Sequence, residues 1–145
     1  MVCHTTETVL EIVYCFAAAA AAFVFGGMYH GHPFIHESFM RESKLQPSPH
    51  TKWPLIIEYL TALVKFVALN LLATELGVTS IAGKLSLAAA LWFAFDFLPT
   101  AAEYVWAGRS FVLLAIHGVY HLSYLFVGLY TVKSLEYASK HLLHV

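Results

Sequence analysis

Two apolar runs in the C-terminal half of the sequence contain side chains that could do acid–base or ligand chemistry. The runs span residues 81–132 and are separated by a short polar turn at 107–110. They hold Asp96, Glu103, His117 and His121. Ionisable groups inside a membrane-spanning helix are costly, so they are expected to pair, to line water or to serve a function. Any activity of this chain is therefore expected to centre on these side chains.

Helical spacing groups these residues, with others from an earlier apolar run, into three polar stripes. Side chains three, four or seven positions apart lie on one face of a helix. By this rule Glu58 shares a face with Lys65, and Asp96 shares one with Glu103. One polar stripe on each of three helices predicts a single shared interior. The expected polar core or relay is Glu58, Lys65, Asp96, Glu103, His117, His121 and Tyr124.

Lys65 and Asp96 are the deepest cation and the deepest anion of these stripes, so we expect them to form an ion pair. A buried charge without a partner would change its protonation state instead. Two interpretations remain open. Either the pair fixes only the orientation of the helices, or it belongs to a proton or ion relay. Aligned carboxylates and histidines serve such relays, and histidine titrates near neutral pH.

The nine histidines among 145 residues suggest a second kind of chemistry. His117 and His121 are four residues apart on one helical face, and His30 and His32 follow an apolar run near the N-terminus. Imidazole suits iron, copper and zinc, so these four are candidate ligands of a haem or a transition metal. Alternatively, they form hydrogen bonds between helices and with lipid head groups. Neither a Cys-x-x-Cys-His haem attachment nor a His-Glu-x-x-His zinc motif occurs.

The composition is that of a membrane protein. Hydrophobic residues make up 59% of the chain and charged residues only 12%, and the mean hydropathy is +0.69. Soluble domains carry about 25% charged residues. A chain of 145 residues accommodates one bundle of four short spans and leaves no room for a second domain. The net charge of −1 argues against nucleic-acid binding, which needs a clustered basic patch.

Four apolar runs are long enough to cross a bilayer, which takes about 20 helical residues. They cover approximately residues 9–28, 55–76, 81–106 and 111–135. The first is interpreted as a retained span, because the eight residues before it carry no Lys or Arg and so do not resemble a signal peptide. Pro99 should kink the third. The expected fold class is all-α: a polytopic membrane protein with four transmembrane helices in one bundle, a single domain over residues 1–145.

The connection between the first two spans is expected to lie on the membrane surface. Residues 34–44 are amphipathic, which is typical of a short interfacial helix. Residues 45–54 hold three prolines, which predicts an extended linker, and Trp53 is expected at the level of the lipid head groups. Four spans put both termini on one side. Basic residues number four in the loops against three on the other side, which favours termini outside.

Small side chains at 17–22 and 88–90 would let helices approach closely, and in lipid such contact is a main source of packing energy. These alanines would pack on another helix of the bundle or on a neighbouring copy. The expected partners are therefore the lipid bilayer, bound lipid, and either further copies of the chain or a larger membrane complex.

Several short motifs carry a resemblance to a known family. They are Ala73-Thr74-Glu75-Leu76-Gly77-Val78-Thr79-Ser80-Ile81-Ala82-Gly83, Leu91-Trp92-Phe93-Ala94-Phe95, Trp106-Ala107-Gly108-Arg109-Ser110, Ile116-His117-Gly118-Val119-Tyr120-His121 and Val127-Gly128-Leu129. In this order they resemble the four-span proteins grouped as domain of unknown function 1761. The segment Gly27-Met28-Tyr29 with Pro33-Phe34 resembles a divergent form of a further family motif. The resemblance implies a four-helix integral membrane fold and no established activity.

The leading functional hypothesis is a small, non-enzymatic integral membrane protein, oligomeric or an accessory subunit, whose polar core conducts protons, ions or a small solute. No Gly-x-Ser-x-Gly elbow, phosphate loop or dinucleotide fingerprint occurs, which favours a non-enzymatic role without deciding it. The alternative is a membrane redox protein that binds haem or a transition metal through its intramembrane histidines.

Overall fold

The computed structural model describes residues 2–43 and 53–142, and throughout this part of the chain the regular structure is helical. The elements are α1 (Val2–Gly31), α2 (Pro33–Ser43), α3 (Trp53–Glu75), α4 (Ile81–Trp92), the π-helical turn η1 (Phe93–Phe97), α5 (Leu98–Trp106) and α6 (Phe111–Leu142). The expected all-α fold class is confirmed. Within the described residues four segments are long and apolar enough to cross a membrane: Leu10–Gly31, Leu55–Glu75, Ile81–Trp106 and Phe111–His141.

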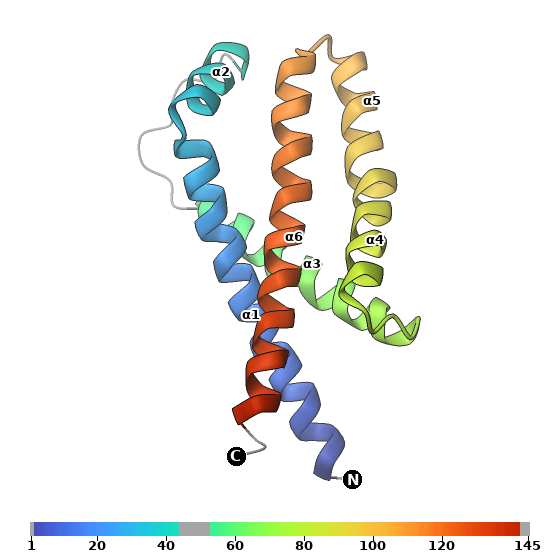
Figure 1. The fold of residues 1–145 in the computed structure, drawn as a ribbon. Coiled ribbons are helices and arrows are strands. Elements are labelled where there is room, and N and C mark those ends of the chain that lie inside the picture. The colour runs from blue at the N-terminus through green and yellow to red at the C-terminus, as the bar shows by residue number, and fades with distance from the viewer. Residues whose placement is uncertain (1, 44–52, 143–145) are drawn as a thin grey trace.

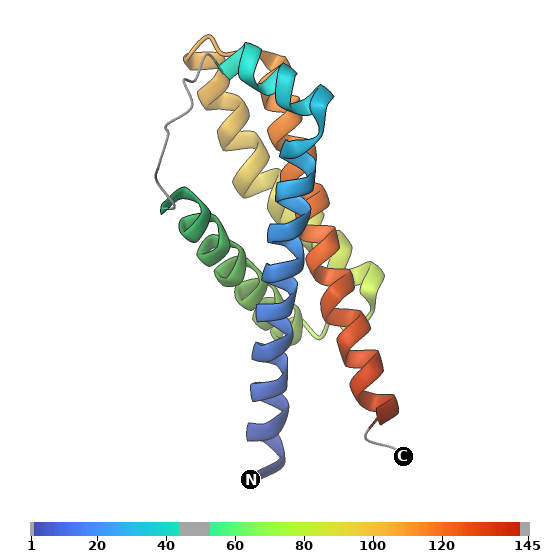
Figure 2. The same cartoon turned by 90° about the vertical axis from the view of Figure 1, so that its left-hand side faces the viewer.

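The helix α6 is the centre of the bundle. It packs against α1 on one side and against α4 and α5 on the other (Figure 1). The helix α3 packs mainly on α1 and runs obliquely to it (Figure 2). The first turns of α1 and the last turns of α6 lie at the same end of the bundle, and the turn between α5 and α6 lies at the other end (Figure 1). Polar residues near the middle of α3, η1 and α6 are thereby brought to a common level.

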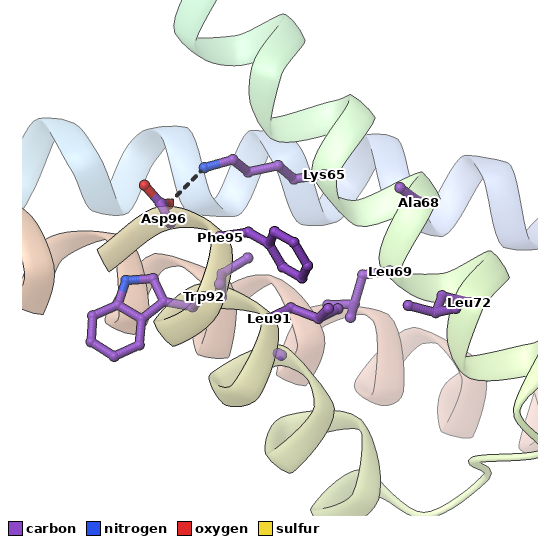
Figure 3. Close-up of a pocket in the computed structure, with 10 residues that line it drawn as sticks. Lys65, Ala68, Leu69, Leu72, Leu91, Trp92, Phe95 and Asp96 are labelled. Carbon is purple, nitrogen blue, oxygen red and sulfur yellow. Dashed lines mark hydrogen bonds and ion pairs between the residues drawn. The ribbon is translucent and has the colours of Figure 1, made fainter. Parts of the chain in front are cut away.

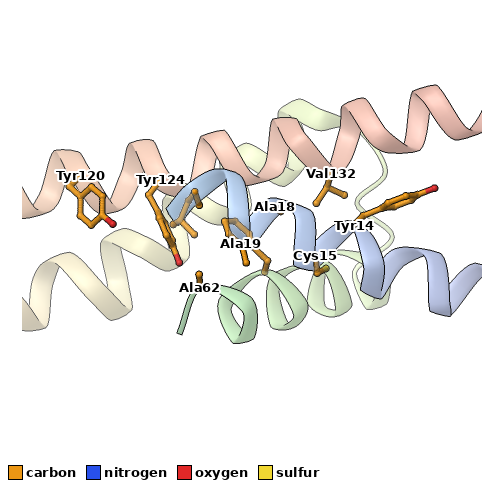
Figure 4. Packing of buried hydrophobic residues seen from close by; sticks show 11 residues of the cluster. Tyr14, Cys15, Ala18, Ala19, Ala62, Tyr120, Tyr124 and Val132 are labelled. Carbon is orange, nitrogen blue, oxygen red and sulfur yellow. The ribbon is translucent and has the colours of Figure 1, made fainter. Parts of the chain in front are cut away.

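Small side chains let α1 approach its neighbours closely. Ala18, Ala19 and Ala22 are each 0% exposed and belong to one cluster with Phe66 and Tyr124 (Figure 4). Close approach of helices supplies van der Waals energy where lipid removes the hydrophobic drive between them. The small-residue face predicted for α1 therefore packs inside this bundle.

Pro99 changes the helix that precedes it. A proline has no N–H donor, and its ring would clash with the carbonyl four residues earlier. The chain widens into the π-helical turn Phe93–Phe97, closed by a hydrogen bond from the Leu98 N–H to the Phe93 carbonyl. Such turns arise where one extra residue enters an α-helix. The kink predicted at Pro99 thus takes the form of a wide turn, and this turn carries Asp96.

The helix α2 folds over the end of the bundle where α5 meets α6 (Figure 2). Its Phe39 packs on a cluster that contains Tyr104, Leu113 and Leu114. Of the predicted linker 45–54, most lies outside the described residues. Trp53 opens α3 and is exposed.

Candidate functional site

Asp96 joins three helical segments through one oxygen. Lys65 Nζ on α3 donates to Asp96 Oδ2 over 3.0 Å, and His121 Nδ1 on α6 lies 3.0 Å from the same Oδ2. Figure 3 shows the contact between Lys65 and Asp96. The ion pair expected from the sequence is present, and the structure adds His121 as a third member. All three side chains are partly buried.

The shared carboxylate assigns a tautomer to His121. A carboxylate that already accepts from a lysine is ionised, so the facing Nδ1 of His121 must be the donor. In the neutral ring Nε2 is then the acceptor. His121 can therefore bind a further proton at Nε2 while its Nδ1–H continues to hold Asp96.

His117 lies one turn along α6 from His121. Its Nδ1 is 2.6 Å from the Tyr104 hydroxyl oxygen, and its ring is stacked on that of His121 with 6.3 Å between centroids. Gly118 allows η1 to come close, since a Cβ there would lie 3.1 Å from the ring of Phe97. A cavity of about 110 Å³ remains between these helices. It is lined by Trp92, Asp96, Phe97, Thr100, Leu114, His117, Gly118 and His121.

Tyr120 links Glu58 to the histidines. Its hydroxyl donates to Glu58 Oε1 on α3. Its ring centroid lies 4.7 Å from that of His30 and 5.3 Å from that of His121. Tyr124 stacks on Phe66 and contacts Tyr120 through its ring. Glu58 thus approaches the Asp96 group through Tyr120, a residue that the sequence reasoning did not select although it lies three positions from His117.

Glu103 lies apart from this group. Its side chain is 66% exposed and is 3.9 Å from Arg109. The next residue, Tyr104, is 3% exposed and takes the interior position beside His117. The displacement by one position follows from η1, because the extra residue of a π-helical turn shifts every later side chain around the axis. The seven-residue spacing from Asp96 therefore does not return to the same face.

The four candidate metal ligands do not form one ligand group. His32 is exposed, whereas His30 packs against Tyr120 and Phe39. The ring of Phe39 also contacts His117. Within residues 2–43 and 53–142 no group of three or more His, Cys, Asp or Glu side chains is arranged to hold a metal ion. His117 and His121 are neighbours, and His30 lies near them against Tyr120, but the three are not arranged as one set of metal ligands.

A second polar group lies near the ends of α1 and α6, and the sequence reasoning did not identify it. Lys84 Nζ donates to Asn70 Oδ1 over 3.2 Å and to Glu136 Oε1 over 3.4 Å. Lys133 reaches the other oxygen of Glu136 over 3.1 Å, and Asn70 reaches Glu11 over 3.4 Å. These contacts tie α1, α3, α4 and α6 together and border a cavity of about 500 Å³.

An apolar layer lies between the two polar groups. Leu69, Ala88 and Leu129 form a buried cluster at this level. Toward the Asp96 group the layer borders a cavity of about 320 Å³ between α3 and α4, and both Lys65 and Asp96 line it. Asp96 therefore lines two cavities, this one and the smaller one beside His117 and His121.

The comparison with known proteins adds one finding. Residues 13–131 match the family described as "Protein of unknown function (DUF1761)". No curated protein and no solved structure matches the chain. The matched range includes Lys65, Asp96 and His121 and reaches into each of the four candidate spans. Since it covers well over half of the 145 residues, the chain belongs to the DUF1761 family.

Proposed function

We propose that this protein is a non-enzymatic, multi-pass membrane protein that moves protons, alone or together with a small solute, through the group formed by Lys65, Asp96 and His121. The observation that carries the proposal is the shared position of Asp96 Oδ2, which lies 3.0 Å from both Lys65 Nζ and His121 Nδ1. A carboxylate held by a lysine and a histidine can give up one of them and keep the other.

His121 can bind a further proton at Nε2 without losing its Nδ1 contact with Asp96, so the group has a place for a transported proton. His117 and Tyr104 extend the polar side chains from His121 toward the α5–α6 turn, with stacked imidazole rings and a 2.6 Å contact. Protons would reach Asp96 from this side.

The mode of transport that we propose is alternating access. The apolar layer of Leu69, Ala88 and Leu129 separates the group around Asp96 from the group around Glu136. A continuous chain of polar side chains would suit a channel, whereas this arrangement favours a site that opens to one side at a time. The two separate cavities that Asp96 lines support the same interpretation.

The experiment that tests the proposal is proton flux into liposomes that contain the purified protein. Asp96→Asn keeps the size of the side chain and removes the charge, so it should reduce flux to the level of protein-free liposomes. Glu103→Gln is the matched control, because the same change is made in the same span at an exposed carboxylate. Equal flux through Asp96→Asn and the wild type, or no flux through either, would refute the proposal.

A transition-metal site on His117 and His121 is the second candidate function. It is favoured by the Nδ1 contacts of both rings, because ligating histidines commonly hold a polar partner on the nitrogen that does not bind the metal. Visible absorption and metal analysis of the purified protein test it. Colour or stoichiometric metal that is lost in the His117→Ala, His121→Ala double variant would support it, and a colourless, metal-free protein would remove it.

A further inference from the structure

The cavity between α3 and α4 combines an apolar body with one charged end. Its volume of about 320 Å³ falls within the size range of small-molecule sites, about 300–1,000 Å³. Leucine, alanine and aromatic side chains form most of its wall, Leu69, Leu91 and Phe95 among them, while Lys65 and Asp96 provide the charges (Figure 3). Such a lining suits an amphiphile with an apolar body and one ionisable group.

The charged end lies near the middle of the membrane. Lys65 is central in the span Leu55–Glu75, and Asp96 is well inside the span Ile81–Trp106. Phospholipid head groups lie at the interfaces, about 15 Å from the middle of a 30 Å core. A permanently charged head group would have to cross apolar lipid to reach Lys65, which is costly. A weak acid can cross the lipid in its neutral form and ionise at the site.

The partner that Asp96 can release is Lys65. Lys65 ends a flexible four-carbon side chain, and Asp96 retains His121 when Lys65 turns away. A cationic ligand would instead take Asp96 and leave the Lys65 ammonium without a counter-charge in an apolar wall. An anionic ligand is therefore the better match, because every charge keeps a partner.

We propose that this cavity binds a small lipophilic carboxylic acid. The acid enters neutral, its O–H bond breaks, and the proton binds to the Asp96–His121 pair. The carboxylate that forms takes Lys65 as its counter-ion. The total charge of ligand and site is the same before and after, and no further reactant is needed. The inference deepens the proposed function on which it rests, since it names the solute that moves with the proton.

Other titratable groups surround His121 and share its electrostatic environment. Asp96 contacts it from η1, and His117 and Tyr120 are its neighbours on α6. Among the described residues, the titratable and charged groups linked to it by contacts or through its neighbours are Glu58 and Lys65 on α3, Asp96 on η1, Tyr104 on α5, His30 on α1, Arg109 in the α5–α6 turn, and His117, Tyr120 and Tyr124 on α6. The proton taken up on binding is therefore assigned to the group, with the Asp96–His121 contact at its centre.

The binding test uses octanoate and protein in lipid nanodiscs, with the dissociation constant measured by calorimetry between about pH 6 and about pH 8. One proton bound per carboxylate predicts a dissociation constant that rises about tenfold per pH unit in the wild type. Lys65→Met should abolish saturable binding. Because that change leaves Asp96 without its lysine, the Lys65→Met, Asp96→Asn double variant, which is neutral at both positions, serves as the second test and should also fail to bind.

Two further variants separate the parts of the proposal. Asp96→Asn leaves Lys65 to hold the carboxylate without the proton, so binding should persist with a dissociation constant that no longer changes with pH. Ala68→Phe should block the cavity, whereas Ala102→Phe makes the same change at an exposed alanine on α5 outside its lining. Binding that is unaffected by Ala68→Phe would overturn the location.

The outcomes distinguish this inference from the proposed function. Proton flux that depends on Asp96, with no saturable octanoate binding, would overturn the ligand and leave the proposed function standing. Saturable binding that does not change with pH would overturn the coupling of acid and proton. The absence of both flux and binding would refute the inference and the proposed function together.

Discussion

At the scale of single residues, one oxygen of Asp96 contacts both Lys65 and His121. Removing one member of a fully buried ion pair costs about 3–5 kcal/mol, because it leaves an uncompensated charge. These side chains are partly exposed, which reduces the cost. When Lys65 is removed, Asp96 keeps its contact with His121, which lowers the cost further. When Asp96 is removed, Lys65 loses its only counter-ion among the described residues.

This difference gives the first prediction. Asp96→Asn should destabilise the folded protein more than Lys65→Met does, with both effects on the order of 1–2 kcal/mol. The double variant should recover most of the loss, because no charge is left unpaired. Denaturant unfolding in detergent micelles measures the four free energies of this cycle. Strictly additive effects would mean that the contact contributes nothing to stability.

At the scale of elements, the contact between α3 and α6 depends on Gly128. A Cβ at this position would overlap the ring of Phe66, which is itself 2% exposed. Gly128→Ala should therefore lower the free energy of unfolding by about 1–3 kcal/mol, as overpacking does. Gly27→Ala is the control, since a Cβ there meets no atom within 4 Å. A control that destabilises as much as Gly128→Ala would contradict the close packing of α3 on α6.

The π-helical turn leads to the next prediction at this scale. Without Pro99 the segment can return to α-helical hydrogen bonding, which would turn Asp96 by about 100° relative to one of its flanks. Pro99→Ala should therefore reduce proton flux while the protein still folds. Pro33→Ala, at the exposed first position of α2, should leave flux unchanged. Normal flux through Pro99→Ala would mean that η1 does not set the position of Asp96.

The same turn explains how far the sequence could predict the site. Apolar length predicts the four spans, and the rule that intramembrane charges pair predicts the contact of Lys65 with Asp96. Helical periodicity misplaces Glu103, because it assumes an unbroken α-helix where the structure has η1. Tyr104 occupies the interior position instead. Helical periodicity alone does not predict that the inward-facing position moves by one residue after Asp96.

At the scale of the whole molecule, two polar groups lie on either side of the apolar layer, and we propose that only the Asp96 group takes part in transport. The group around Glu136 ties α1, α3, α4 and α6 together near the ends of α1 and α6, and its Lys84 side chain is only 11% exposed. Such cross-links between four helices act on the stability of the bundle. The small-residue face of α1 also packs within the bundle, so it contributes to the same stability.

Glu136→Gln should separate stability from transport. It removes the carboxylate that Lys84 and Lys133 share, so the midpoint of thermal unfolding should fall. Flux per folded molecule should remain that of the wild type, because the Asp96 group lies beyond the apolar layer. Flux that falls as completely as in Asp96→Asn would contradict this division between the two polar groups.

The proposal that Asp96 carries the transported proton can be tested by the pH change inside proteoliposomes under an imposed proton gradient. The comparison needs the wild type, Asp96→Asn and Glu103→Gln at equal amounts of folded protein. We predict equal flux for the wild type and Glu103→Gln, and for Asp96→Asn a rate no greater than that of empty liposomes. Undiminished flux through Asp96→Asn would contradict the claim.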